Sequence, residues 1–584
     1  MYPTHQQFFR QRYLAALLLA SVVQTGAAAQ ELETDERQEQ RRRARAEATA
    51  REQLAQQPRV TLQENTAASP ANPDALTLPS ESPCFVIEQV ALSIPPQLPP
   101  TTHALAASAL MQDRFYFAQQ YLQQYQGACI GNAGVNLIVQ RLTAQILAKG
   151  YSTTRLGIAA QDLSTGRLIL TLVPGVIRTI RFADPATAAT WRNAFPTGPG
   201  QLLNLQDIEQ GLEQMKRVPS QDVDMEIVPA TLPGESDIVI TVRQRRPWKV
   251  SVSLDDSGSK ATGKLQSGIH LSLDNLLGVN DLFNLGINSD AQRQGPLRGT
   301  SGANIYYAVP YGYWTFSLAA SSYDYHQQIA GLNQSFVSSG KARNLDLSTQ
   351  QLFYRDQYQK HSWQFKLGKR WSRSYIDDTE IEVQRRNTSY AEIAWLHTHY
   401  LGTGQLNLTL ANRWGVSWFN AQPDLPSRSA DAPTYRYTLQ SLDASLYAPF
   451  SLGSQSLNYI GSLRAQTTRS ALFQSEQFAI GNRYTVRGFD GEQTLTAERG
   501  IYLRNELELP LAHSAQALYA GLDGGRVFGP STHHLLGDKL AGAVVGARGT
   551  LAGLHYDVFI AAPLVKPQGL KSAPVSGFSL HYQY

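Results

Sequence analysis

Arg487 is the residue of this chain whose setting suggests a specific chemical task. It stands in the tetrapeptide Val486-Arg487-Gly488-Phe489, between long runs in which polar and apolar residues alternate. Such alternation predicts the strands of a membrane β-barrel, where an arginine requires a polar interior and a carboxylate partner. Carboxylates near it in the sequence are Asp490, Glu506 and Glu508. For the tetrapeptide taken alone, a surface hairpin is the alternative interpretation.

Motifs for catalysis or nucleotide binding are weak or absent in the sequence. The segment Gly258-Ser259-Lys260-Ala261-Thr262-Gly263-Lys264 matches most of a phosphate-binding P-loop. Leu265 stands where that motif requires Ser or Thr, and we expect a strand to follow in place of the helix. There is no Gly-x-Ser-x-Gly or His-Glu-x-x-His motif, and the 12 histidines are scattered. We therefore expect a protein that is not an enzyme and that binds neither cofactor nor metal.

Residues 1–29 have the pattern of a secretory signal peptide. Arg10 and Arg12 precede an apolar stretch from residue 14 to residue 23, and Ala27-Ala28-Ala29 follows it. The apolar stretch is too short to span a bilayer as a helix, and no later segment has 18 apolar residues in a row. We expect an exported protein that is cleaved after Ala29 and has no membrane helix.

Cys84 and Cys129 are the only two cysteines among the 584 residues. In an exported chain this count predicts one structural disulfide, which would close a loop of about 45 residues and stabilise the fold by about 4 kcal/mol. Two unpaired buried thiols are the alternative. The net charge of +4 is small for this length and gives no reason to expect nucleic acid as a partner.

Residues 30–56 are dense in charge of both signs. Seven acidic residues and six arginines lie between residues 31 and 54, and most of the others are Gln or Ala. Glu47 and Arg51 have the spacing of a favourable pair on a helix. Because such a helix has no apolar face, it cannot dock on a hydrophobic core. We expect either a plug helix in a water-filled, charged barrel lumen or a solvated tail.

Residues 57–82 are rich in Pro, Ala, Ser, Thr and Asn and are predicted to form a flexible linker. Two small α+β units follow, each predicted as strand–helix–helix–strand–strand (βααββ). In the first, residues 83–174, we expect strands at 84–90, 152–159 and 167–173 and helices at 102–124 and 135–150. In the second, residues 175–246, we expect strands at 176–183, 222–228 and 237–243, a helix around Trp191 and a helix at 205–217. Asn204 is the expected N-cap of that last helix, and Pro219 follows its end.

From residue 247 to residue 584 the pattern is that of β-strands throughout. Within residues 314–320, for example, Trp, Phe and Leu alternate with Thr and Ser. Only a closed barrel satisfies every strand hydrogen bond in lipid without helices. A soluble β-sandwich would alternate too, but it is usually shorter. At roughly 20 residues per strand and turn, the segment predicts a barrel of about 16 antiparallel strands.

The two small units resemble POTRA domains, the periplasmic substrate-binding modules of protein-translocating barrels. The pattern Cys84…Gly127-Ala128-Cys129-Ile130 with Gly150-Tyr151-Ser152-Thr153-Thr154-Arg155 is similar to the first POTRA domain of the haemolysin-activator (ShlB) type. The run from Leu203 to Leu212, followed by Arg217-Val218-Pro219-Ser220, is similar to the second. The order of charged helix, linker, two POTRA units and barrel resembles the outer-membrane transporters of two-partner secretion, the TpsB family.

The resemblance implies roles for several residues. Val486, Arg487, Gly488 and Phe489 would lie on a loop folded back into the barrel. Arg487 would pair with Asp523, because Tyr519-Ala520-Gly521-Leu522-Asp523-Gly524-Gly525 resembles the inner-wall strand that supplies the aspartate. Alternation near the C-terminus resembles the signal for outer-membrane barrel assembly, and its residues are Phe578, Leu580, Tyr582 and Tyr584.

The resemblance also implies a function in the cell outer membrane, with the POTRA domains in the periplasm. The POTRA pair would bind one large unfolded exoprotein, and the barrel would export it without nucleotide. A haemolysin or a contact-dependent inhibition toxin is the expected cargo, with an adhesin next. We also expect contacts with outer-membrane lipids and lipopolysaccharide, with the barrel assembly machinery and with periplasmic chaperones, and a monomer. The alternative is an assembly factor for outer-membrane proteins (a BamA-like insertase), which usually carries more POTRA units and lacks the charged helix.

Overall fold

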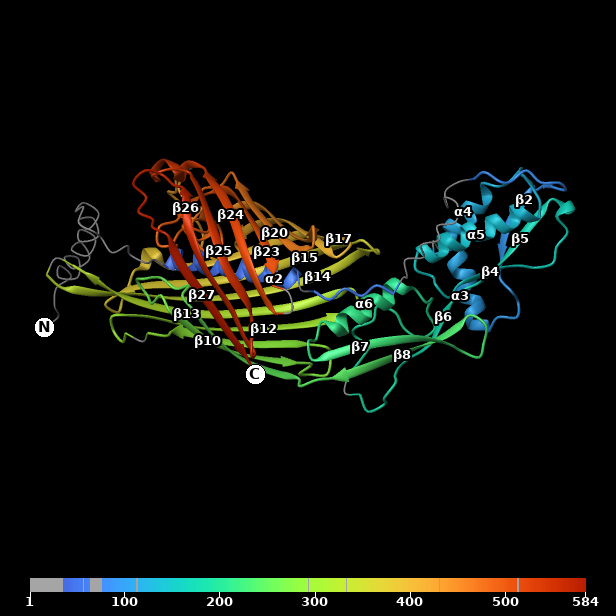
Figure 1. The fold of residues 1–584 in the computed structure, drawn as a ribbon, viewed down its shortest axis with the longest axis horizontal. Coiled ribbons are helices and arrows are strands. Elements are labelled where there is room, and N and C mark those ends of the chain that lie inside the picture. Colours follow the sequence, from blue (N-terminus) through green and yellow to red (C-terminus); the bar gives the residue numbers. More distant parts are fainter. Residues whose placement is uncertain are drawn as a thin grey trace.

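The computed structural model describes residues 35–55, 57–62, 76–111, 114–187, 189–292, 294–331, 333–429, 431–511 and 514–584. Figure 1 shows a β-barrel with a helix inside it and two smaller units beyond one end of the barrel. The predicted signal peptide, with its cleavage site after Ala29, lies outside the described residues. Among the described residues, no helix is both long and apolar enough to cross a membrane.

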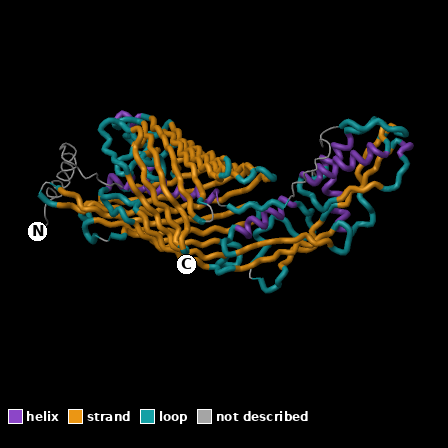
Figure 2. The backbone as a smooth tube through the Cα atoms, in the orientation of Figure 1, coloured by secondary structure: helices purple, strands orange, loops and turns teal. Residues whose placement is uncertain are grey.

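Sixteen long antiparallel strands close the barrel (Figure 2), which confirms the predicted fold class and strand number. They are β9 (Trp248–Asp255), β10 (Gln266–Asp274), β11 (Leu282–Asp290), β12 (Arg298–Tyr311), β13 (Trp314–Ala330), β14 (Ser335–Arg355), β15 (Gln359–Ile376), β17 (Arg386–Leu401), β18 (Gly404–Val416), β19 (Thr438–Leu452), β20 (Gln455–Thr468), β23 (Arg499–Pro510), β24 (Gln516–Phe528), β25 (Lys539–Leu551), β26 (Leu554–Val565) and β27 (Val575–Gln583). The two-residue strand β16 (Thr379–Glu380) pairs with the end of β15. Closure occurs where β27 pairs with β9, so the ladder has no open edge in lipid.

Alternate residues of the strands face the lipid and the lumen, as the sequence pattern predicts. On β15, Trp363, Phe365 and Leu367 are exposed on the outside of the barrel. Between and beyond them, Lys366 and Arg370 point inward, where Lys366 pairs with Glu392 and Arg370 with a carboxylate of the helix in the lumen. The barrel therefore presents an apolar surface to lipid and a charged surface to its interior.

The first small unit packs three helices against a three-stranded sheet. The helices are α3 (Pro100–Met111), α4 (Tyr116–Gln123) and α5 (Asn132–Ala148), and the sheet order is β2 (Gln89–Ser93), β5 (Arg167–Val173) and β4 (Arg155–Ile158). A separate ladder joins β1 (Phe85–Val86) to β3 (Cys129–Ile130), and η1 (Leu163–Thr165) precedes β5. In place of the single helix expected over residues 102–124, α3 and α4 are separate. The chain turns before α4 so that the side chain of Phe115 is fully buried in the core.

The second small unit has the sheet order β6 (Val176–Phe182), β8 (Glu235–Gln244) and β7 (Gln221–Pro229), covered by α6 (Leu205–Lys216). As expected, Asn204 caps α6, its Oδ1 accepting a hydrogen bond from Gln206 N at 2.8 Å. The prediction of a helix around Trp191 is wrong. Residues 189–204 contain only one turn, in which Phe195 N donates to Trp191 O at 3.0 Å. Pro196 follows at once and disfavours helical geometry in the residue before it.

The predicted linker contains neither helix nor strand in its described parts, residues 57–62 and 76–82. The second part is fastened to the first unit, where Glu81 accepts hydrogen bonds from Gly131 N, Ala133 N and Gly134 N at 2.8–2.9 Å. Burial alone would raise the pKa of the Glu81 carboxylate, but these three donors outweigh it and lower that pKa. Glu81 thus caps the start of α5, and the predicted flexibility does not extend to this anchored part of the linker.

Candidate functional site

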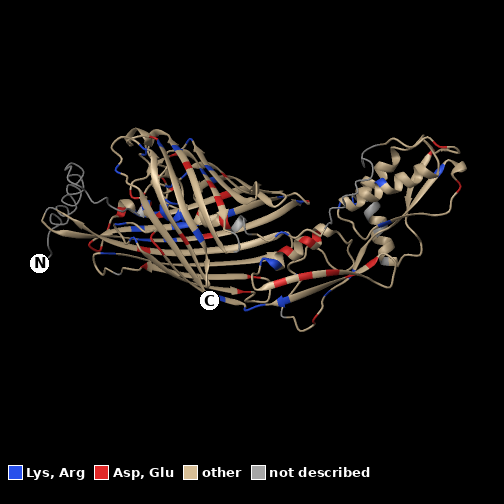
Figure 3. Cartoon of the chain, in the orientation of Figure 1, with Lys and Arg blue, Asp and Glu red and all other residues tan. Residues whose placement is uncertain are grey.

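Helix α2 (Asp35–Ala55) lies inside the barrel, along its lumen (Figure 1). The helix has no apolar stripe, and charged residues lie along it and on the strands around it (Figure 3), so hydrogen bonds and ion pairs hold it to the wall. Glu39 Oε1 accepts from Arg370 Nη1 of β15 at 2.6 Å, and Glu36 Oε1 accepts from Arg386 Nη2 of β17 at 3.2 Å. Both arginines are far from α2 in the sequence. The carboxylates of the helix therefore find these partners only in the folded barrel.

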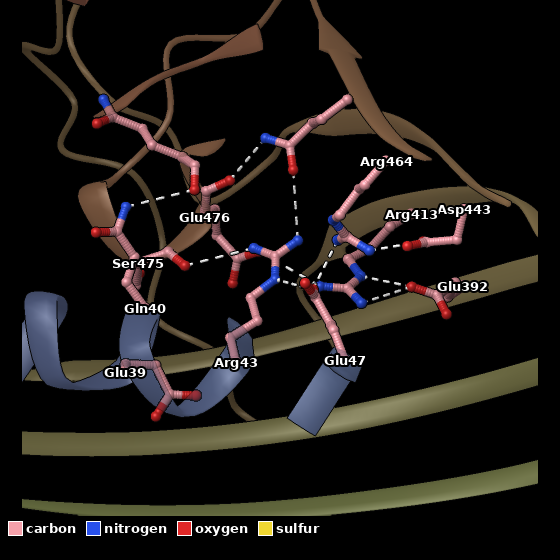
Figure 4. Close-up of polar contacts among 12 residues, drawn as sticks. Glu39, Gln40, Arg43, Glu47, Glu392, Arg413, Asp443, Arg464, Ser475 and Glu476 are labelled. Carbon is pink, nitrogen blue, oxygen red and sulfur yellow. Dashed lines mark hydrogen bonds and ion pairs between the residues drawn. The ribbon is translucent and has the colours of Figure 1, made fainter. Parts of the chain in front are cut away.

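Figure 4 shows a denser cluster around Arg43 and Glu47 of the same helix. Arg43 Nη1 donates to Glu476 at 3.1 Å, and Glu47 accepts from Arg464 Nη2 of β20 at 2.6 Å. Arg464 also donates to Asp443 of β19 at 2.6 Å. Glu47 of the helix therefore adds a second carboxylate to an arginine that is already paired within the barrel wall. Removing one member of a buried cluster of this kind costs roughly 3–5 kcal/mol, because its partner is left uncompensated.

Other contacts of α2 reach distant parts of the barrel circumference. Arg42 Nη2 donates to Ser321 Oγ of β13 at 3.0 Å, and Arg45 pairs with Asp255 of β9 at 3.3 Å. Arg51 pairs with Asp443 of β19 at 3.3 Å. The helix is thus held from several sides of the barrel.

The helix leaves part of the lumen unfilled. A cavity of about 730 Å³ separates α2 from the inner faces of several strands between β9 and β15. Its lining includes Ser253, His270, Asn304 and Asn344. A polar cavity of this size holds water, so many helix side chains are wetted on this side. Water supplies hydrogen bonds that can replace the contacts of α2 when it moves.

The segment between β20 and β23, residues 469–498, folds back into the barrel and is called the inner loop below. It contains η3 (Gln474–Glu476) and a hairpin of β21 (Phe478–Ile480) and β22 (Leu495–Ala497). Apolar side chains fasten this hairpin to β23, β24 and β25. The buried cluster consists of Phe478, Ile480, Val486, Phe489, Leu495, Ala497, Tyr502, Val527, Leu540 and Leu570. Val486 and Phe489 of the tetrapeptide are therefore packing residues.

Arg487 joins the inner loop to β24 by a polar contact. Its main-chain N and Nε both donate to Asp523 Oδ2, at 3.0 and 2.7 Å, and Nη2 donates to Oδ1 at 2.8 Å. Glu506 of β23 accepts from Nη1 at 2.5 Å. The side chains of Arg487 and Asp523 are 7% and 0% exposed. The planar guanidinium thus meets one carboxylate on two sides and a second carboxylate at its tip.

Glycines make room for the tetrapeptide on the inner wall. A Cβ on Gly542 of β25 would lie 1.9 Å from Arg487 O, and a Cβ on Gly521 of β24 would lie 2.6 Å from Arg487 Nη2. Gly488 has a φ of +101°, and a Cβ there would meet Ala562 O at 2.6 Å. The Arg-Gly dipeptide is therefore required by the close approach of two backbones as well as by charge.

The helix and the inner loop also touch each other. Arg41 Nη2 donates to Gly491 O at 2.9 Å, and Gln40 Nε2 donates to Gln474 O at 2.6 Å. Together with the Arg43–Glu476 pair, these contacts make α2 and the inner loop one assembly inside the lumen. A movement of either element breaks contacts of the other.

Cys84 and Cys129 are joined by a disulfide, with their Cα atoms 5.4 Å apart. The bond lies in the β1–β3 ladder, where Val86 is opposite Cys129, and α5 begins three residues after Cys129. It therefore ties the first strand of the first small unit to the connection between two helices.

The C-terminal aromatic pattern lies on the lipid side of the closing strand. On β27, Phe578 is opposite Val558, and Tyr582 is opposite Val252, and directly opposed residues share a face. Leu580 is on the same face by alternation. Tyr584 N donates to Val250 O at 3.0 Å, which extends the seam beyond β27.

The segment that resembles a P-loop, residues 258–264, forms a tight turn between β9 and β10. Thr262 Oγ1 accepts from Gln38 Nε2 of α2 at 3.2 Å, and Lys260 Nζ donates to Asp490 of the inner loop at 3.1 Å. Its polar residues thus bind the two elements that occupy the lumen.

A charged cluster between α6 and the barrel was not predicted from the sequence. Arg355 donates to Glu209 and to Glu213, each at 3.1 Å, and its side chain is 3% exposed. The same carboxylates accept from Leu62 N at 2.7 Å and from Val60 N at 2.9 Å. This cluster joins the second unit, the barrel rim and the chain that leaves α2. The spacing of Glu209 and Glu213 on one helix face was the available signal.

A barrel closed from within by a polar helix and an inner loop, with two POTRA-like units at one end, defines an outer-membrane protein transporter. The sequence matches the family described as haemolysin secretion/activation protein ShlB/FhaC/HecB over residues 234–549, a POTRA domain over 176–229 and a ShlB-type POTRA domain over 113–175. The chain belongs to this family. It is a transporter of two-partner secretion in the outer membrane, with its POTRA domains in the periplasm.

Individual relatives agree with this membership. The outer membrane transporter CdiB-2 of Burkholderia pseudomallei (strain 1026b) is 43% identical over 580 residues, which cover 98% of this chain and 99% of the relative. The hemolysin transporter protein ShlB of Serratia marcescens is 29% identical over 68% of this chain and 71% of its own length. The solved structure of CdiB from Acinetobacter baumannii aligns with a TM-score of 0.82 and 26% identity, covering 95% of this chain and 100% of that one.

Proposed function

We propose that this transporter exports a contact-dependent inhibition toxin through the barrel once α2 and the inner loop have moved. Identity supports this cargo over a haemolysin, since the CdiB-2 relative matches at 43% over 98% of the chain and the haemolysin transporter at 29% over 68%. An adhesin is the third candidate. No enzymatic step is needed for this transport, and we expect neither nucleotide nor cofactor.

The polar character of the closure is the observation that carries the proposal. α2 meets the wall through ion pairs and hydrogen bonds, beside a cavity of about 730 Å³. Polar contacts of this kind can be replaced by water, whereas an apolar plug would pay the full cost of exposing its core. The lumen is therefore built to be closed at rest and opened without unfolding the barrel.

Capture of the unfolded cargo is expected at the edges of the POTRA sheets. β2 and β4 are the edges of the first sheet, and β6 and β7 are the edges of the second. An extended peptide can add to such an edge through main-chain hydrogen bonds. Ile158 of β4 and Val228 of β7 are exposed and would supply apolar contacts for its side chains.

The Arg355 cluster would transmit this capture to the plug. Val60 follows the end of α2 by five residues, and its N–H is bound by Glu213 of α6. A shift of α6 relative to Arg355 on the barrel rim would therefore pull on the chain that leads to α2. The inner loop would follow, because Arg41 and Gln40 hold it to α2.

Export of defined cargo tests the proposed function. The secretion domain of a contact-dependent inhibition toxin and that of a haemolysin are fused to the same reporter and expressed with this transporter. We expect at least tenfold more of the toxin fusion outside the cell. Preferential export of the haemolysin fusion would overturn the assignment of cargo, and export of neither would overturn the role of the chain as a transporter for these two classes.

A further inference from the structure

Four basic residues gather on the outer wall of the barrel, on two neighbouring strands. Lys341 and Arg343 lie on β14, and Lys369 and Arg373 lie on β15. In the strand register, Lys341 is opposite Arg373. Directly opposed residues share a face, so these side chains project together. We refer to these four residues as the outer basic cluster.

Their neighbours fix the direction in which they point. Asn344 and Arg370 both contact Glu39 of α2 inside the lumen. Arg343 and Lys369 are adjacent to them along the chain and so lie on the outer face of the sheet. Lys369 is only 7% exposed there, because the chain at Phe419 covers it. Trp371, between Lys369 and Arg373, is 40% exposed, as expected for a residue on the outer surface.

Aromatic side chains at two heights on the outer wall show where the cluster lies in the membrane. The β14–β15 turn is at the periplasmic end, since Arg355 there contacts α6. Close to this end, Trp363 stacks on Phe353 with ring centroids 5.7 Å apart. Trp371 lies eight residues further along β15, which is roughly 26 Å of strand. Because barrel strands are tilted by roughly 35–45°, this length rises only about 20 Å through the membrane. Arg373 and its strand partner Lys341 are ten residues from Trp363 along the ladder, which is roughly 33 Å of strand and a rise of about 25 Å. This rise equals the height of the apolar band, so Arg373 and Lys341 lie at the outer interface and Trp371 lies just below them.

The cluster keeps an excess of positive charge at this level. Asp324 of β13 is opposite Lys341, and Glu380 is close to Arg373 but forms its own pair with Arg385 at 2.5 Å. Lys369 Nζ donates to the main-chain O of Phe419 at 2.8 Å, which leaves its charge without a carboxylate in that contact. Cations that face lipid require an anionic partner or headgroup to be favourable.

A groove beside the cluster is suited to a polar headgroup. It has a volume of about 550 Å³, and its lining includes Lys341, Asp324, His326, Ser301 and Gly299. Serine, glycine and histidine at positions that face outward are unusual inside an apolar band. They offer hydrogen bonds to sugar hydroxyl groups next to the positive charges.

We propose that the outer basic cluster binds the phosphate groups of lipid A, with the sugar portion of the glycolipid in the adjoining groove. Arginine and lysine bind phosphate strongly through charge-assisted hydrogen bonds. The outer leaflet at this end of the barrel is where phosphorylated glycolipid is found. Binding would fix β14 and β15, the strands whose inner faces hold Glu39, and so would steady the resting position of α2.

Titration of the purified, delipidated full-length transporter tests the site. The probes are bisphosphorylated lipid A, the same lipid without its phosphates, and phosphatidylglycerol. The test variant carries Lys341→Gln, Arg343→Gln and Arg373→Gln. The matched control carries Lys539→Gln, Lys566→Gln and Lys571→Gln, which remove the same charge elsewhere at the extracellular end. Heat-dependent migration on gels shows whether each barrel is folded.

We expect the wild type and the control to bind bisphosphorylated lipid A equally, and the test variant to bind it at least tenfold more weakly. The dephosphorylated lipid should bind all three proteins weakly. Equal binding by the folded test variant would overturn the site. Equal affinity of the wild type for phosphatidylglycerol would overturn lipid A as the ligand. If the triple variant does not fold, the single variant Arg343→Gln takes its place, with an expected loss of threefold and the same criteria.

Discussion

Arg487 and Asp523 are joined by three hydrogen bonds, from the main-chain N, Nε and Nη2 of the arginine, at 2.7–3.0 Å. The arginine thus uses its backbone as well as its side chain, which fixes the orientation of the inner loop on β24. Glu506 adds a second carboxylate at 2.5 Å. Of the carboxylates open to choice in the sequence, the structure brings together Asp523 and Glu506, and it places Asp490 against Lys260.

Loss of this contact should stop export more than folding. Arg487→Ala leaves Asp523 buried without its cation, at a cost of roughly 3–5 kcal/mol, while Glu506 still pairs with Arg548. Asp523→Ala should cost less, because Glu506 still holds the arginine. In a double-mutant cycle on secretion yield, the double variant should lose less than the sum of the single losses. Arg499→Ala, an exposed arginine of β23, should export normally. Additive losses would instead favour direct contact of Arg487 with the cargo.

A methyl group on the inner wall should have a similar effect without changing charge. In Gly542→Ala the new Cβ would lie 1.9 Å from Arg487 O, so the inner loop must shift. Gly524→Ala is the matched control, since a Cβ there meets nothing within 4 Å. We expect a loss of export at least tenfold greater for Gly542→Ala, measured at equal amounts of folded barrel. Equal export by the two variants would show that the loop position does not matter.

Removal of α2 should open the pore. Deleting residues 35–55 should raise the conductance of single barrels in planar bilayers several-fold, because the helix occupies the lumen. Arg43→Gln with Glu47→Gln should give intermittent opening, since both lose their pairs with Glu476 and Arg464. Thr49→Ala, whose hydroxyl bonds only to Arg45 O of its own helix among the contacts described, serves as the control. Unchanged conductance in the deletion would place the helix elsewhere in the membrane-bound protein.

The Arg355 cluster should hold the chain that follows α2. In Arg355→Gln, both carboxylates still accept from the main-chain N–H groups of residues 60 and 62. Of the cations described around them, Glu213 keeps Lys360 at 2.6 Å and Glu209 loses its one partner. The loss of roughly 3–5 kcal/mol of pairing should loosen residues 59–62. Trypsin cleavage after Arg59, followed by mass spectrometry, should then be faster than in wild type, and Lys360→Gln should have a smaller effect. A cleavage rate equal to that of wild type would remove the cluster from the proposed transmission path.

The disulfide should stabilise the first small unit. Replacing both Cys84 and Cys129 by Ser should lower its free energy of unfolding by about 4 kcal/mol, from the length of the loop that the bond closes. Protease treatment of the full-length protein in denaturant should show earlier cleavage within residues 83–174, with the barrel unaffected. Mass spectrometry of non-reduced peptides checks the bond itself, and two free thiols in exported protein would contradict it.

Periodicity explains which parts of the fold were predictable. Alternation along strands such as β13 and the helical spacing of Ile138, Leu142 and Ile146 depend only on which side of an element is buried. The break between α3 and α4 did not follow from spacing, because it is imposed by burial of Phe115 in the tertiary core. The turn at Trp191 had a visible cause in Pro196, which the helix assignment overlooked.

One part of the site could be predicted because a buried arginine requires a carboxylate partner. Arg487 among alternating residues required a carboxylate, and family resemblance supplied Asp523. The partners of α2 could not be read from the sequence, because its charges meet side chains hundreds of residues away, such as Arg370 and Arg464. The same holds for Arg355, whose partners on α6 are neighbours only after the second unit docks on the barrel rim.

The central claim is that α2 must leave its place in the lumen for export to occur, and a reversible cross-link tests it most directly. Gln38 and Thr262 are in contact at 3.2 Å, so Gln38→Cys with Thr262→Cys can be bridged by a short, reducible bis-thiol reagent. Each single variant treated with the same reagent is the control. We predict that the bridged transporter exports no cargo and that reduction restores export to the level of the controls. Export at the control rate while the bridge is intact would contradict the account.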